Sequence, residues 1–234
     1  MHIRKNFMKP LEKKYAVITV FAVAMAFMEA AVVVYLRALY YPGGFAFSLA
    51  VLPRNIFLIE IAREAATIIM LGAAALLASR KFYGRFAVFL YAFAVWDIFY
   101  YVFLKALLGW PGSFFEMDVL FLIPVVWRGP VLAPLICSLT MLVLGAMIER
   151  GRAAAENFRL SAAEWGLLWA GAIIIFISFT LPIYDLAGNG VLNSDSPPLY
   201  NWRPFLGGEF LILLALFILS KRRVKNWSGS GEIC

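Results

Sequence analysis

The chain has 234 residues, of which 63% are hydrophobic and 15% are charged, and its formal net charge is +7. Soluble domains are usually about 45–50% apolar and about 25% charged. A chain of this length cannot bury so much apolar surface in one aqueous core, so lipid must be its main solvent. The composition excludes a disordered chain, a disulfide-stapled domain and a nucleic-acid-binding domain, and no nucleic acid partner is expected.

Histidine and cysteine are too rare for many cofactor sites. The single histidine is His2, and the two cysteines are Cys137, in an apolar segment, and Cys234, the last residue. A haem held by two histidines, a His-ligated zinc and a Ser–His or Cys–His dyad are thereby excluded. We expect no cofactor. Any metal bound by side chains would be a hard, oxygen-preferring cation such as Na⁺, Ca²⁺ or Mg²⁺.

Six apolar segments are long enough to cross a bilayer, which takes about 20 residues of helix. They predict one integral membrane domain over residues 1–234, with an all-α fold built as a bundle of six transmembrane helices. The expected spans are 15–39, 55–78, 86–108, 129–148, 165–186 and 204–220. In the first span, Ala22, Ala26 and Ala30 recur at a spacing of four, which favours close packing against another helix.

The basic residues predict how the spans are oriented. Most of the 21 Lys and Arg residues lie in the two terminal tails and in the connections after the second and fourth spans. With six spans, these four segments share one side of the membrane, which the positive-inside rule assigns to the cytoplasm. We therefore expect a multi-pass protein of the cell (inner) membrane with both termini in the cytoplasm.

A run of prolines precedes the fourth span. Pro124, Pro130 and Pro134 interrupt residues 118–148, a segment too long for one straight span. Because proline removes a backbone donor and clashes with the preceding turn, a helix here must bend or break. We predict a broken or re-entrant half-helix over about 118–126, which ends near Arg128. A single kinked helix is the alternative.

Charged residues inside spans cost about 2.5–3.5 kcal/mol each on insertion scales, so each needs a partner or a function. Spacing places two sets on shared helix faces: Glu60 with Arg63 and Glu64, and Asp97 with Tyr101 and Lys105. All intramembrane charges fall at or beyond the expected midplane, towards the outer side. They predict an outward-facing polar cavity. Its candidate substrate- or ion-binding residues are Glu29, Glu60, Arg63, Glu64, Asp97, Tyr101, Lys105, Arg128 and Glu209. The alternative is a set of ion pairs that only hold the helices together.

Three functions fit these features. The favoured hypothesis is transport or permeation of a small solute or ion, linked to protons or cations. It rests on the polar cavity, the interrupted helix and the aromatic-containing external loops over 40–53 and 187–203. A non-catalytic subunit or assembly factor of a larger membrane complex fits the small size and the lack of cofactor ligands. The third is an outer-leaflet lipid-modifying enzyme that uses carboxylates as acid and base. The expected partners are the lipid bilayer and either further copies of the chain or a larger complex.

Overall fold

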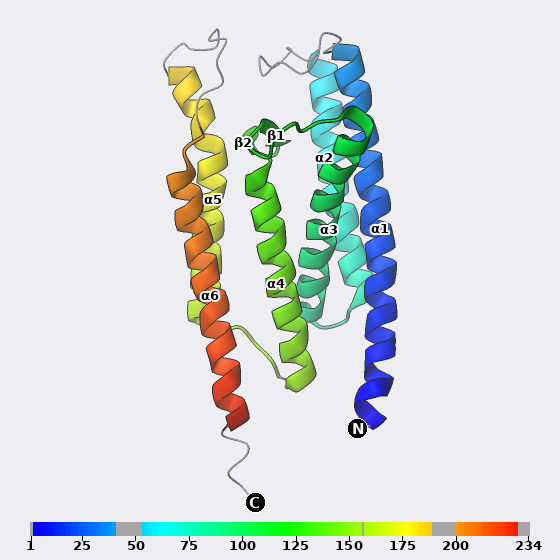
Figure 1. The fold of residues 1–234 in the computed structure, drawn as a ribbon, viewed down its shortest axis with the longest axis vertical. Coiled ribbons are helices and arrows are strands. Elements are labelled where there is room, and N and C mark those ends of the chain that lie inside the picture. The colour runs from blue at the N-terminus through cyan, green and yellow to red at the C-terminus, as the bar shows by residue number, and fades with distance from the viewer. Residues whose placement is uncertain (1, 41–52, 156, 189–199, 229–234) are drawn as a thin grey trace, which may run out of the picture.

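The computed structural model describes residues 2–40, 53–155, 157–188 and 200–228. These residues form six helices and one two-stranded antiparallel sheet (Figure 1). The elements are α1 (His2–Tyr40), α2 (Arg54–Ala78), α3 (Phe82–Leu108), β1 (Met117–Phe121), β2 (Trp127–Pro130), α4 (Leu132–Ala154), α5 (Ala162–Gly188) and α6 (Trp202–Ser228). Each helix is long and apolar enough to cross a membrane. The six predicted spans are confirmed as helices, which indicates a multi-pass integral membrane protein.

Local sequence explains where α3 ends and where α5 begins. The last turn of α3 is followed by Gly109, whose φ of 68° is left-handed and whose N–H donates to the Lys105 carbonyl at 3.0 Å. Glycine adopts this conformation without steric cost. Before α5, the Ser161 N–H donates to the Glu164 carboxylate at 2.7 Å, and the Glu164 N–H donates to the Ser161 hydroxyl at 3.3 Å. This capping box satisfies two amides that a helix start leaves unpaired.

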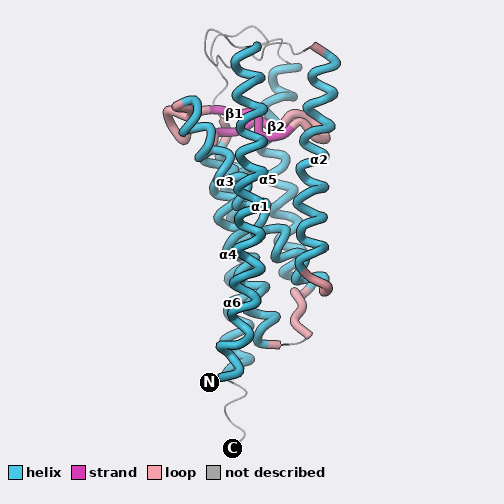
Figure 2. The backbone as a smooth tube through the Cα atoms, turned by 90° about the vertical axis from the view of Figure 1, so that its right-hand side faces the viewer, coloured by secondary structure: helices cyan, strands magenta, loops and turns pink. Residues whose placement is uncertain are grey.

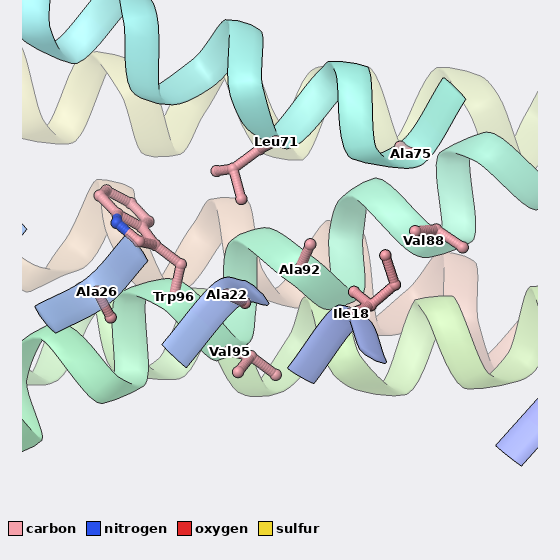
Figure 3. Packing of buried hydrophobic residues seen from close by; sticks show 9 residues of the cluster. All are labelled: Ile18, Ala22, Ala26, Leu71, Ala75, Val88, Ala92, Val95 and Trp96. Atoms are coloured by element: carbon pink, nitrogen blue, oxygen red, sulfur yellow. The ribbon is translucent and has the colours of Figure 1, made fainter. Parts of the chain in front are cut away.

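The first three helices pack through small side chains. One buried cluster draws on α1, α2 and α3, and Figure 3 labels its nine members, which are Ile18, Ala22, Ala26, Leu71, Ala75, Val88, Ala92, Val95 and Trp96. Ala22, Ala26 and Ala30 have no exposed surface, which confirms the close packing predicted for this face of α1. Methyl side chains allow the helix backbones to approach one another, and contact of this kind drives association in lipid.

The last two helices form a pair of their own. α5 and α6 pack mainly on each other and meet the rest of the protein chiefly through α4 and β2 (Figure 1). A Cβ added at Gly171 of α5 or at Gly208 of α6 would lie 2.7 Å from the carbonyl oxygen of the other glycine. Only glycine permits such an approach. The helices therefore fall into two groups, α1–α4 and α5–α6.

The half-helix predicted over 118–126 is wrong, because β1 and β2 form a hairpin at this place (Figure 2). Asp118 pairs with Gly129, and Val119 pairs with Arg128. The predicted interruption of the helix before the fourth span does occur, and α4 begins at Leu132 instead of 129. Branched and aromatic residues favour a strand, and proline is tolerated in a turn or at a strand end.

Contacts with neighbouring elements hold the hairpin across the helices, near the end of the bundle opposite the start of α1 and the end of α6 (Figure 2). The Val131 N–H donates to the Glu116 carbonyl at 2.9 Å, and a Cβ added at Gly129 would lie 3.0 Å from the Phe179 ring of α5. An isolated two-stranded hairpin is marginal, so these contacts stabilise it. Of the predicted external loops, residues 41–52 and 189–199 lie outside the described residues.

Candidate functional site

Arg63 of α2 lies among three glutamates where α1 meets α2. It forms an ion pair with Glu29 of α1, another with Glu60 at 2.8 Å, and lies 4.0 Å from Glu64. Spacings of three and four residues bring the α2 side chains onto one face. The Thr67 hydroxyl donates to Glu29 at 3.2 Å. These five residues are the Arg63 cluster, which joins two helices that otherwise have few contacts with each other.

Glu64 ties the Arg63 cluster to the hairpin, because its carboxylate accepts the Leu122 N–H at 2.8 Å. In the described part of the chain, one arginine faces three carboxylates. A carboxylate at membrane depth is costly, so a proton or another cation is needed for charge balance. Among the described residues, no group of three His, Cys, Asp or Glu side chains has the arrangement of a metal site.

Asp118 of β1 belongs to a second charged contact, which the sequence analysis missed. Its carboxylate lies 3.8 Å from the Arg37 guanidinium and accepts the Tyr101 hydroxyl at 3.1 Å. Arg37 also lies over the Trp110 ring, 4.0 Å from its centroid. Asp118 is only 4% exposed. Burial raises the pKa of Asp118 to about 6 and outweighs the lowering by Arg37 and by the hydrogen bond from Tyr101.

Stability should depend on pH through Asp118. Its pKa is higher in the folded protein, at about 6, than the ordinary value of 3.8. The folded state therefore binds more protons between these values, and the contribution of Asp118 to stability falls as pH rises through this window. Unfolding of the wild type and of Asp118→Asn should be compared from about pH 4 to pH 7. The wild type should lose stability relative to the variant as pH rises. A constant difference would contradict this assignment.

Lys105 and Arg128 lie apart from the Arg63 cluster. The Lys105 ammonium donates to the Gly109 and Pro111 carbonyls at 3.0 and 2.8 Å, and its side chain is exposed at the end of α3. A lysine that reaches the interface in this way needs no buried partner. Arg128 lies on β2, opposite Val119. The nine candidate residues are therefore not gathered in one site.

A cavity of about 410 Å³ lies between the two groups of helices. Its lining comes from α3, α4, α5, α6 and the hairpin. Along α3 the lining extends from Phe86 to Tyr101, and along α5 from Trp165 to Phe179. Each of these stretches covers roughly 20 Å of helix, because an α-helix rises 1.5 Å per residue. The cavity is thus elongated and follows the direction of the helices.

Two buried carboxylates line this cavity, Asp97 of α3 and Glu209 of α6. The Ser138 hydroxyl donates to Asp97 at 2.7 Å, and the Thr140 hydroxyl donates to Glu209 Oε2 at 3.1 Å. Glu209 Oε1 has no hydrogen-bond partner among the described residues. No described Lys, Arg or His side chain lines the cavity. The described residues therefore give the wall a fixed charge that is zero or negative.

Aromatic rings form much of the remaining wall. They are Phe86, Phe93, Trp96, Tyr100, Tyr101, Phe121, Trp127, Trp165, Trp169, Phe176 and Phe179. Trp127 joins the hairpin to α5, because its ring meets Phe176 edge-on at a centroid distance of 5.0 Å. The indole N–H groups of Trp96 and Trp127 are buried and find no acceptor among the described residues. A buried donor without an acceptor costs about 1–3 kcal/mol.

No protein-family model, curated protein sequence or solved structure matches this chain. Its function therefore has to be argued from the site itself. Of the nine candidate residues, four meet in the Arg63 cluster, while Asp97, Tyr101 and Glu209 line the cavity. Residue spacing on α2 indicated the first group. The aromatic wall was not predicted, because its rings come from α3, α5 and the hairpin, which lie far apart in the sequence.

Proposed function

We propose that the chain is a membrane transport protein for a single-chain amphipathic molecule. The elongated cavity between α1–α4 and α5–α6 supports this proposal most directly. Ligand sites are typically apolar concavities in which a few polar groups orient the ligand. Here the wall is largely aromatic, and its two carboxylates, Asp97 and Glu209, are supplied by α3 and α6. Such a wall suits an alkyl chain with one polar head better than it suits a hydrated ion.

The two groups of helices supply a way to move the molecule. Because α5 and α6 meet the other helices chiefly through α4 and β2, a shift against α1–α4 would leave the α1–α3 core intact. It would repack the buried cluster that α3 and α4 share with α5 and α6, which includes Leu90, Leu144 and Leu216. The amphipath enters from the bilayer with its chain along the aromatic wall and its head beside the carboxylates. A carboxylate in so apolar a site needs a proton or another cation. Release of a proton can therefore accompany the arrival of a cationic head.

Flux through proteoliposomes tests this function. The probes are radiolabelled dodecyltrimethylammonium and dodecyl sulfate at trace concentration, because their permanent charges slow their passage through bare lipid. We expect the protein to speed the uptake of at least one probe by about tenfold or more, which corresponds to a barrier lowered by about 1.4 kcal/mol. Uptake of both probes at the rate of protein-free vesicles would contradict the proposal.

A lipid-modifying enzyme is the second candidate, because two carboxylates line one lipid-sized cavity. One of them would act as general acid and the other as general base. Mass spectrometry of the amphipath after incubation with the protein separates the two candidates. Recovery of unchanged probe favours transport, and a hydrolysed or transferred head group favours the enzyme.

We also propose that the protein lies in the cell (inner) membrane with both termini in the cytoplasm. The start of α1 and the end of α6 lie at the same end of the bundle (Figure 1), together with the short connections that carry Arg80, Lys81 and Arg159. Basic residues on one side favour the cytoplasm there. Two kinds of reporter enzyme can be fused after the C-terminus, one that works only in the cytoplasm and one that works only in the periplasm. We expect activity from the cytoplasmic reporter alone. Activity of a periplasm-dependent reporter at this position would reverse the orientation.

A further inference from the structure

The charge of the cavity wall distinguishes between kinds of amphipath. Asp97 and Glu209 are its acidic groups, and no described basic side chain lines it. An anionic head placed there would face carboxylates without a cation, which is unfavourable in an apolar site. A cationic head would instead complete the charge balance. Its desolvation would be offset in part by ring faces, since Trp, Tyr and Phe attract cations.

Glu209 offers an unused acceptor to such a head. The residue is 5% exposed, and its Oε2 is bonded to Thr140. Its Oε1 is buried and accepts no hydrogen bond of good geometry within the described residues, and the Cys137 thiol of α4 lies beside the same carboxylate. Asp97 likewise receives one hydrogen bond, from the Ser138 hydroxyl to its Oδ2 at 2.7 Å. An N–H donor of a ligand that reaches Glu209 Oε1 would gain a charge-assisted hydrogen bond at a buried oxygen that otherwise lacks one.

We propose that the cavity is a binding site for long-chain primary ammonium compounds, with the ammonium at Glu209 and the alkyl chain along the aromatic wall. This inference rests on the proposed function, since it names the substrate class of the same cavity. The lining extends over roughly 20 Å of α3 and α5, enough for an extended chain of a dozen carbons. The ammonium donates to Glu209 Oε1, and its charge is shared with Asp97 across the cavity.

Tryptophan fluorescence provides the readout, because four of the seven tryptophans line the cavity, namely Trp96, Trp127, Trp165 and Trp169. The probes share a dodecyl chain brominated at its end, which quenches nearby indoles. Their heads are primary ammonium, trimethylammonium, hydroxyl and sulfate. Binding is measured for the full chain in nanodiscs of neutral lipid. We expect the primary ammonium to bind about tenfold or more tightly than the alcohol and the sulfate to bind most weakly.

Glu209→Gln should abolish this preference, so that the primary ammonium and the alcohol bind with similar affinity. The control variant is Glu116→Gln, which alters a carboxylate in the loop before β1 that does not line the cavity. It should keep the wild-type order of affinities. The order of affinities for the four head groups is measured on the wild-type protein, so this part of the test holds even if a variant fails to fold.

The outcomes separate the two claims. The reference for binding in the cavity is Ala172→Phe, whose added ring enters the cavity. If no probe quenches the wild-type protein more than it quenches this variant, the cavity binds no amphipath and the proposed function fails as well. If the sulfate or the alcohol binds as tightly as the primary ammonium, or if Glu209→Gln keeps the ammonium preference, the ammonium assignment is overturned while amphipath binding stands.

Discussion

Replacing Arg63 with Met should lower the free energy of unfolding by about 3–5 kcal/mol, the cost of leaving buried charges without their partner. Arg63 is the cation that the structure places among Glu29, Glu60 and Glu64, and its side chain is 20% exposed. Its loss leaves three carboxylates facing one another near α1. Adding Glu29→Gln and Glu60→Gln to Arg63→Met should restore most of the stability, because replacing a whole buried ion pair by neutral groups is often harmless.

The measurement is thermal or denaturant unfolding in nanodiscs, with Arg152→Met as the matched control. Arg152 pairs with Glu149 at 2.8 Å, but Glu149 keeps Lys14 at 3.1 Å when Arg152 is removed. The control should therefore cost less than about 1 kcal/mol. If Arg63→Met is as stable as the control, the Arg63 cluster contributes little to the stability of the fold. A triple variant that folds but no longer supports flux would give the cluster a functional role as well.

Replacing Ala172 with Phe should block the cavity and weaken amphipath binding by about tenfold or more. Ala172 lies on the α5 side of the lining, and the added ring enters a space of about 410 Å³. Overpacking a full core costs about 1–3 kcal/mol, but an open cavity can accept the ring at a smaller cost. Binding should therefore fall without a comparable loss of stability.

Ile173→Phe is the control for this variant. Ile173 is the next residue of α5, is 53% exposed, and does not line the cavity. Its replacement adds a ring of the same kind to the outer surface of the same helix. Both variants are titrated with the brominated dodecylammonium probe. Equal binding by Ala172→Phe and the wild type would mean that the probe lies elsewhere, whereas equal losses in both variants would indicate a general effect on α5.

The helices could be predicted because each carries its own signal. A stretch of about 20 apolar residues must hydrogen-bond its backbone internally in lipid, whatever its neighbours are. The alanines at positions 22, 26 and 30 could be assigned to a packed face for a similar reason, since small residues at a spacing of four mark one side of a single helix. Both features depend on residues close together in the sequence.

The hairpin could not be predicted in this way. Pro124 and Pro130 correctly indicated that no continuous helix crosses this segment. What replaces the helix depends on contacts with distant residues, such as the Leu122 N–H on Glu64 and the fit of Gly129 against Phe179. A two-stranded hairpin has little stability without such contacts. The prolines alone therefore predicted a kinked helix or a half-helix, and not a hairpin.

The candidate site was predicted in part for the same reason. Glu60, Arg63 and Glu64 lie within five residues of one helix, so their shared face followed from spacing. Which helices lie beside each other did not. Asp97 meets Ser138 of α4, and Glu209 meets Thr140 of the same helix, so both face the cavity and not Arg63. Asp118 was not among the predicted site residues, because its burial depends on the hairpin, which was not predicted.

Photo-crosslinking most directly tests the central claim that an amphipath occupies the cavity between α3 and α5. A dodecylammonium probe with a diazirine in its chain is irradiated with the full chain in nanodiscs, and the labelled residues are mapped by mass spectrometry. We expect labels on residues 86–101 and 165–179 that disappear when unlabelled dodecylammonium is added. Labels on exposed positions of α2, such as Ile69 and Leu77, should persist. Labelling confined to such lipid-facing positions, or unaffected by the competitor, would contradict the account.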